Sequence, residues 1–176
     1  MLREMLLGRL SLLASVVALA SAAVAVPVSG AGSSSTTRLA GVETQIVKEI
    51  NRVRATRGLR ALTLSSGLRS AAVSHTRAML SANFFDHTSM DGTSFGDRIA
   101  RTYPQRPNRP WAVGETLYRT TGVLTAREVV SGWLDSAGHR DILLSAQWRE
   151  IGIGVARSQT GADAVGSIAT ADFGTR

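Results

Sequence analysis

The chain contains no cysteine, which excludes disulfide frameworks, thiolate metal sites and thiol nucleophiles. Aromatic residues are scarce, at 5%, so stacking platforms for single-stranded nucleic acid are thin. Lysine is almost absent, because Lys48 is the only one among 20 basic residues, and this indicates a genome-wide bias toward arginine. The formal net charge of +7 is spread over separate arginine clusters without a contiguous run, which argues against a nucleic-acid partner.

The rest of the composition is ordinary for a globular protein. Hydrophobic residues make up 44% of the 176 positions and charged residues 19%, which excludes wholesale disorder and collagen-like repeats. A chain of this length fits one domain, and a domain of about 150 residues buries a full core without covalent cross-links. We therefore expect a single domain, in either a reducing or an oxidising compartment.

The N-terminus has the features of a targeting segment. Arg3 and Arg9 form a basic start, and an uncharged apolar stretch ending in small residues follows. We predict a signal peptide over residues 1–25, export of the protein, and no stable membrane span after cleavage. An uncleaved anchor is the alternative, because the stretch is almost long enough to cross a bilayer. Residues 26–40 are predicted to be a flexible linker and residues 41–176 the folded domain.

Apolar spacing predicts helices first and strands later in the domain. Helices are expected from Val42 until Gly58, from about Ser66, from Thr93 or Ser94, from a Thr125–Glu128 capping box to Gly138, and over residues 139–144. Extended segments are expected over residues 62–64, 111–118, 151–155 and 165–173, the last two as an antiparallel hairpin. This order indicates an α+β protein or a layered α-β-α sandwich.

Three ionisable residues form a candidate site: His87 in a loop, Glu115 on the inward face of a strand and His139 beside a helix end. Two imidazoles and one carboxylate are an open zinc set, with water as the fourth ligand. The separations of 28 and 24 residues form no local motif. Architectural alternatives therefore stay open, in which the loop histidine bonds its own backbone, the carboxylate pairs with an arginine and His139 caps a helix.

Two further arrangements are weaker. Ser136 and His139 lie three residues apart, but no Gly-x-Ser-x-Gly turn surrounds Ser136, which argues against a serine hydrolase. His75 lies on the apolar stripe of a predicted helix, so we interpret it as a satisfied core residue. Neither observation supplies a nucleophile.

Five blocks along residues 43–174 together resemble a known family. They are Asn83-Phe84-Phe85-Asp86-His87-Thr88 with Asp91-Gly92-Thr93 and Arg98; Gly114-Glu115-Thr116; Trp133 to Leu143 (WLDSAGHRDIL); Glu150 to Gly154 (EIGIG); and Asp172-Phe173-Gly174. The blocks are similar to the signatures of the CAP superfamily of cysteine-rich secretory, antigen 5 and pathogenesis-related proteins. The bacterial branch fits best, since the chain has no cysteine.

This resemblance implies a three-layer α-β-α sandwich around a small antiparallel sheet. It also implies a central cleft with two histidines and two acidic residues, which holds a divalent metal in some members. His87, Glu115 and His139 match three of these positions, and the fourth falls at Ser136. That departure weakens a four-ligand site and leaves an open three-ligand site for a metal such as zinc. Thr116 stands where the family often has asparagine.

Three functions follow as hypotheses. The first is a secreted, non-catalytic CAP domain whose cleft, at His87, Glu115, Ser136 and His139, binds a small ligand, a lipid, a cell-wall component or a divalent metal. The second is a metal-dependent hydrolase of peptide or cell-wall substrates, with Glu115 as general base. The third is a basic adhesion protein held at the cell wall by anionic polymers. The polar cluster is also interpretable as purely architectural.

Overall fold

A computed structural model describes residues 31–158 and 166–176 of the chain, with side chains from residue 41 onward. The predicted signal peptide, residues 1–25, lies outside the described residues. The linker expected over residues 26–40 overlaps the first helix, which begins at Ala31. Residues 31–176 form one compact unit.

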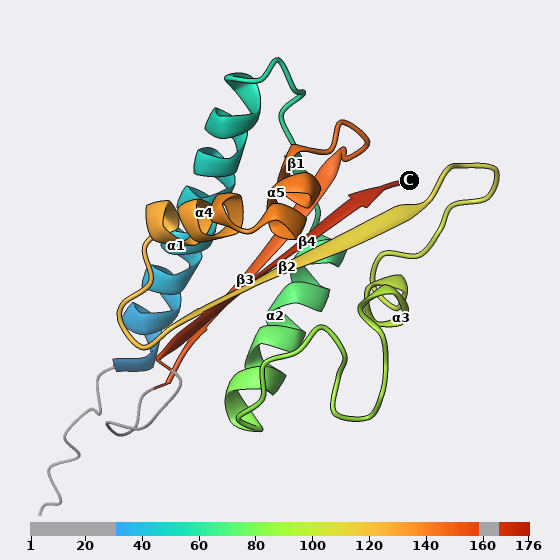
Figure 1. The fold of residues 1–176 in the computed structure, drawn as a ribbon. Coiled ribbons are helices and arrows are strands. Elements are labelled where there is room, and N and C mark those ends of the chain that lie inside the picture. The colour runs from blue at the N-terminus through green and yellow to red at the C-terminus, as the bar shows by residue number, and fades with distance from the viewer. Residues whose placement is uncertain (1–30, 159–165) are drawn as a thin grey trace, which may run out of the picture. The chain divides into compact units, whose positions relative to one another are not determined.

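Five helices and four strands make up the described part (Figure 1). The helices are α1 (Ala31–Ala55), α2 (Ser66–Ser81), α3 (Phe95–Ala100), α4 (Ala126–Asp135) and α5 (Ala137–Leu144). The strands are β1 (Thr63–Leu64), β2 (Ala112–Thr120), β3 (Glu150–Arg157) and β4 (Ser167–Thr175), in the sheet order β1-β3-β4-β2. The predicted hairpin of β3 and β4 is confirmed, and β2 also pairs antiparallel with β4. The short β1 differs from the expected antiparallel sheet, because it pairs parallel with β3.

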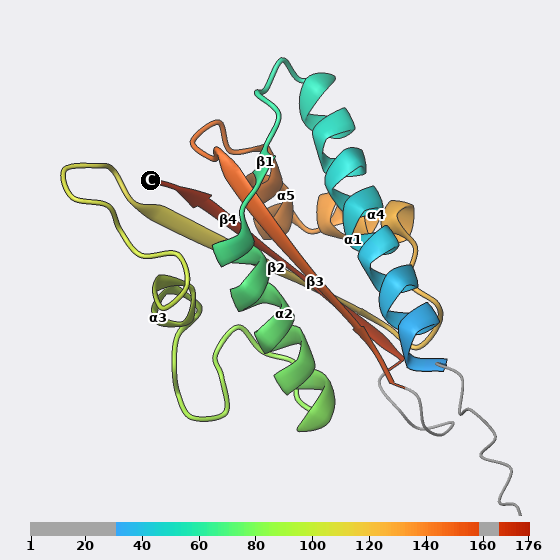
Figure 2. The same ribbon diagram turned by 180° about the vertical axis from the view of Figure 1, so that it is seen from behind.

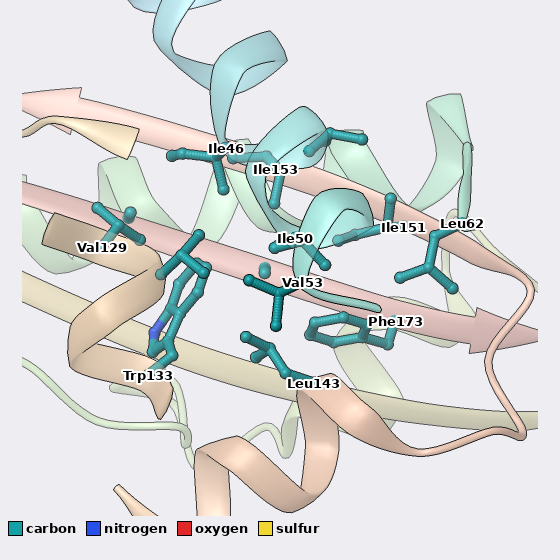
Figure 3. Packing of buried hydrophobic residues seen from close by; sticks show 14 of the residues in the cluster. Ile46, Ile50, Val53, Leu62, Val129, Trp133, Leu143, Ile151, Ile153 and Phe173 are labelled. Carbon is teal, nitrogen blue, oxygen red and sulfur yellow. The ribbon is translucent and has the colours of Figure 1, made fainter. Parts of the chain in front are cut away.

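Helices cover both faces of the sheet, as expected for a three-layer α-β-α sandwich (Figures 1 and 2). One face packs against α1, α4 and α5 through the main apolar cluster (Figure 3). This cluster includes Ile46, Ile50, Trp133, Ile153 and Phe173, each at most 1% exposed. The other face packs against α2 and α3 through two smaller clusters. Because side chains alternate across a strand, neighbouring β2 residues serve opposite layers.

Helix α2 lies directly on β3 because two glycines leave room for its backbone (Figure 2). A Cβ atom at Gly152 would lie 2.0 Å from the backbone nitrogen of Arg69, and one at Gly154 would lie 2.5 Å from that of Val73. The glycine face predicted for this strand therefore accommodates a helix backbone.

Local signals fix most helix ends. Ser65 and Ser94 cap α2 and α3, and Thr125 forms the predicted capping box with Glu128 at the start of α4. The prediction that Gly138 ends α4 is wrong. The helix ends at Ser136, whose backbone is extended (φ −88°, ψ 123°), and Gly138 lies inside α5.

Candidate functional site

Glu115 is the centre of the candidate site, on the face of β2 that points toward α2 and α3. Its side chain is fully buried although it is charged. A buried carboxylate needs hydrogen bonds and a counter-charge, because burial removes its water. Both are present here, since each of its oxygens accepts a hydrogen bond from a different residue.

Arg98 supplies the counter-charge from α3. Its Nη2 donates to Glu115 Oε2 at 2.5 Å, and its side chain is 9% exposed. Its Nη1 donates to the His87 carbonyl at 3.2 Å and to Ser89 Oγ at 3.1 Å. One arginine therefore fixes both the carboxylate and the loop that carries His87. The pairing of Glu115 with an arginine was one of the alternatives left open by the sequence, and the structure identifies that arginine as Arg98. The sequence did not identify Arg98, although its place in the first family block was an available signal.

His87 contacts the other oxygen of Glu115. Its Nδ1 lies 2.8 Å from Glu115 Oε1, and its side chain is 46% exposed. Because an ionised carboxylate only accepts hydrogen bonds, Nδ1 carries the proton and Nε2 of the neutral ring has a free lone pair. The hydrogen bond to Glu115 raises the pKa of His87, against partial burial that lowers it.

His139 on α5 lies beside His87, with 6.3 Å between the two ring centroids. Burial lowers the pKa of His139, and the positive charge of a protonated His87 lowers it further. The structure thus brings together His87, Glu115 and His139, which are separated in the sequence. Ser136 lies at the junction of α4 and α5, and its side chain makes no capping hydrogen bond to α5.

Two buried groups lie beneath this cluster. Asp172 stands opposite Glu115 in the β2–β4 register and is 0% exposed. Burial, followed by the negative charge of Glu115, holds the pKa of Asp172 well above its usual value. His75 is 1% exposed and lies 2.8 Å from the Asp86 carbonyl through Nε2. Its core position is as predicted, but its Nδ1 has no partner among the described residues.

The imidazoles of His87 and His139 are the candidate metal ligands at this site. Among the residues whose positions are described, no group of three or more histidine and acidic side chains is arranged to hold a metal ion. Glu115 is engaged by Arg98 and His87 through both oxygens. Its contact with Nδ1 is the arrangement in which a carboxylate orients a metal-binding histidine from behind. Glu115 therefore lies outside any donor set that the two imidazoles would form.

The family follows from comparison with known proteins. A family model described as CAP, the cysteine-rich secretory protein family, matches residues 47–173. The chain belongs to the CAP family. This confirms the resemblance carried by the five sequence blocks.

The curated relatives that the chain matches are longer than the chain itself. Protein YkwD of Bacillus subtilis is 30% identical over 132 residues, which are 74% of this chain and 46% of YkwD. The membrane protein YlbC of the same organism is 30% identical over 115 residues, or 65% of this chain and 32% of YlbC. The chain thus spans less than half the length of these relatives.

Solved CAP structures share the fold. An extracellular protein with an SCP domain from Bacillus anthracis superimposes with a TM-score of 0.65 at 26% identity, covering 78% of this chain and 41% of that protein. An outer surface protein of Borrelia burgdorferi superimposes with a TM-score of 0.64 at 21% identity, covering 74% and 90%. The predicted sandwich is confirmed.

Proposed function

We propose that this CAP domain acts outside the cell as a non-catalytic binding module, with the ligand site between His87 and His139. Two structural relatives are described as extracellular and outer-surface proteins, which supports this location. The predicted signal peptide agrees with it. Among the described helices, none has the length and hydropathy needed to cross a bilayer.

One observation carries the proposal: the buried Arg98–Glu115 pair holds the exposed imidazole of His87 in one tautomer. A charged pair with one fully buried member costs free energy to bury. In this protein, the pair fixes the orientation of the His87 ring beside His139. Such an arrangement presents nitrogen lone pairs to a ligand without further reorganisation. The ligand class is either a divalent metal or an organic molecule that hydrogen-bonds both rings.

If the ligand is a metal, His87 Nε2 and the His139 ring would hold it, while Glu115 keeps the proton on Nδ1. A bound zinc ion would supply Lewis acidity toward an oxygen of a further ligand. Protons compete for the same nitrogens, so the raised pKa of His87 makes the metal affinity fall as the pH decreases.

The hydrolase alternative requires a free general base. Glu115 was the candidate for that role, but both of its oxygens accept hydrogen bonds from Arg98 and His87. A base must reach the proton that it abstracts, and Glu115 is fully buried. We therefore prefer binding to hydrolysis for this cleft.

The test is isothermal titration of Zn²⁺ into the protein from residue 26 onward, beside three variants. H87A and H139A should each abolish binding, because either change leaves one imidazole. E115Q keeps the shape of the side chain but loses its charge, and should weaken binding by about 10–100-fold. Q45A, at an exposed position of α1, is the control and should bind as the parent does.

Zinc affinity that is the same in the parent, H87A and H139A would contradict the metal site. If the parent binds no zinc, the ligand is organic, and lipid and cell-wall fragments should then bind to the parent and not to H139A. Failure of both titrations would overturn the proposed function.

A further inference from the structure

A groove with a volume of about 730 Å³ runs between the outer flank of α2 and β3, away from the His87–His139 cleft. It exists because β1 is short. β1 pairs only with Glu150 and Ile151, so within residues 31–158 and 166–176 no strand lies beside the rest of β3 on that side. Figure 2 shows α2 and α1 flanking this part of β3. The groove is therefore bounded by helix side chains and not by a further strand.

The middle of the groove already holds a carboxylate from the protein itself. Glu43 of α1 accepts hydrogen bonds from Arg69 of α2 at 2.6 and 3.0 Å through one oxygen. Its other oxygen accepts from the Val155 backbone nitrogen at 3.4 Å. This contact pairs one groove arginine with a carboxylate of the protein, and it also covers the backbone of β3 at Val155.

Two further arginines lie at one end of the groove. Gly152 contacts α2 at Arg69, and Gly154 contacts α2 at Val73. A step of four residues along the helix therefore covers about the same distance as a step of two residues along β3. The same step brings Arg77 level with the end of β3, where Arg157 also lines the groove. Both side chains are exposed. Among the described residues, neither has a carboxylate partner, so two positive charges face the groove uncompensated.

A row of hydroxyl groups continues from these arginines along α2. Ser66, Ser70 and Ser74 are four residues apart, so they share one flank of the helix, and all three are exposed. Hydroxyl and guanidinium groups both donate hydrogen bonds to oxyanions. The wall therefore offers donors repeatedly along its length, which suits a chain of oxyanions better than a single ion.

We propose that this groove binds a linear phosphate polymer, with Arg77 and Arg157 on phosphate oxygens and the serine row along the chain. An extended acidic peptide fits less well, because it would pair with the edge of β3, and Glu43 occupies that edge at Val155. This groove would be the surface at which anionic polymers hold the protein to the cell wall, as in the third hypothesis drawn from the sequence. Polymer binding there does not depend on the proposed cleft function, because no cleft residue lines the groove.

The test is a fluorescence titration of the same protein with short inorganic polyphosphate over a range of salt concentrations. R77Q/R157Q should weaken binding by about tenfold or more, and the slope of log affinity against log salt should fall by roughly one for each arginine. The matched control is R106Q/R109Q, which removes the same charge from the exposed loop before β2 and should change the affinity less than about twofold. Circular dichroism should be unchanged in both variants, since all four side chains are exposed.

Equal losses in the two double variants would overturn the proposal, because binding would then follow net charge alone. The second titration uses polyglutamate of the same length as the polyphosphate. If it binds as tightly as polyphosphate and is equally sensitive to R77Q/R157Q, the groove recognises carboxylate chains and the phosphate assignment is wrong. H87A should bind polyphosphate like the parent, which keeps this result separate from the cleft.

Discussion

At the scale of single residues, the cleft depends on two buried carboxyl groups of which only one is paired with an arginine. Glu115 and Asp172 stand opposite each other on neighbouring strands, and both are buried. Of the two carboxyl groups, only that of Glu115 accepts a hydrogen bond from Arg98, and like charges directly opposite in a sheet are destabilising. Burial and the neighbouring Glu115 carboxylate raise the pKa of Asp172, which favours the protonated form of Asp172 and so lessens the repulsion.

Replacing Asp172 by asparagine therefore tests the protonation state. In the folded parent, Asp172 stays protonated at pH values above the ordinary Asp pKa of 3.8, whereas in the unfolded chain it loses its proton there. The free energy of unfolding of the parent therefore falls as the pH rises above 3.8. D172N removes this dependence. Its free energy of unfolding relative to the parent should rise with pH between pH 4 and neutral, measured by urea denaturation.

The pKa of His87, followed by NMR, gives an independent readout for D172N. An asparagine replacing a neutral acid should leave that pKa nearly unchanged. A marked fall in the His87 pKa would mean that Asp172 is ionised in the parent, since a nearby negative charge had been lost.

At the scale of elements, the close approach of α2 to β3 determines where the cleft forms. Gly152 and Gly154 let the helix backbone lie on the strand, and His75 of this helix contacts the Asp86 carbonyl in the loop that also carries His87. The alternation of glycine with Ile151 and Ile153 was visible in the sequence. It predicted a strand with one small face, but not which helix would cover that face.

Gly152→Ala should destabilise the fold strongly. Its Cβ would lie 2.0 Å from the Arg69 nitrogen, and backbone atoms cannot move aside as a flexible side chain can. We expect a loss of at least about 3 kcal/mol in the free energy of unfolding, or failure to fold. The control is Gly138→Ala in α5, where a Cβ meets nothing within 4 Å and the helix should gain up to about 1 kcal/mol. Similar melting temperatures for the two variants would contradict the packing argument.

At the scale of the whole molecule, Glu43 closes the open side of the sheet. An unpaired strand edge is a template for association with another chain, and proteins cover such edges with charged groups. The Glu43–Arg69 ion pair spans from α1 to α2 across β3 and occupies the Val155 backbone nitrogen. It therefore links the two helical layers and protects the edge between them.

Glu43→Ala should make the protein less stable and more prone to self-association. Loss of the bonds to Arg69 and Val155 should cost about 1–2 kcal/mol in the free energy of unfolding. Sedimentation velocity should show concentration-dependent dimers. Glu49→Ala is the matched control on the same helix, since Glu49 pairs with the exposed Arg52, and it should cost less than about 0.5 kcal/mol. A monomeric E43A with unchanged stability would show that the edge needs no cover.

The sequence predicted the order of helices and strands better than the hydrogen bonds within the cleft. Periodicity and capping signals identified the helices and the final hairpin, because these depend on neighbouring residues. The family blocks identified His87, Glu115 and His139. The bonds of Arg98 could not be derived, because they join α3, a loop and β2 through tertiary packing. The break at Ser136 was also missed, since Gly138 seemed the stronger stop signal.

That break limits how the length of the chain can vary. A single extended residue, Ser136, separates α4 from α5, so the rotation of His139 about its helix axis is set by a one-residue connection. Each inserted or deleted residue would turn the following helix by about 100°. Exchanging the side chain at position 136 leaves the imidazole where it is, whereas a one-codon insertion or deletion there would direct it away from His87. This junction therefore tolerates variation in residue type but not in residue number.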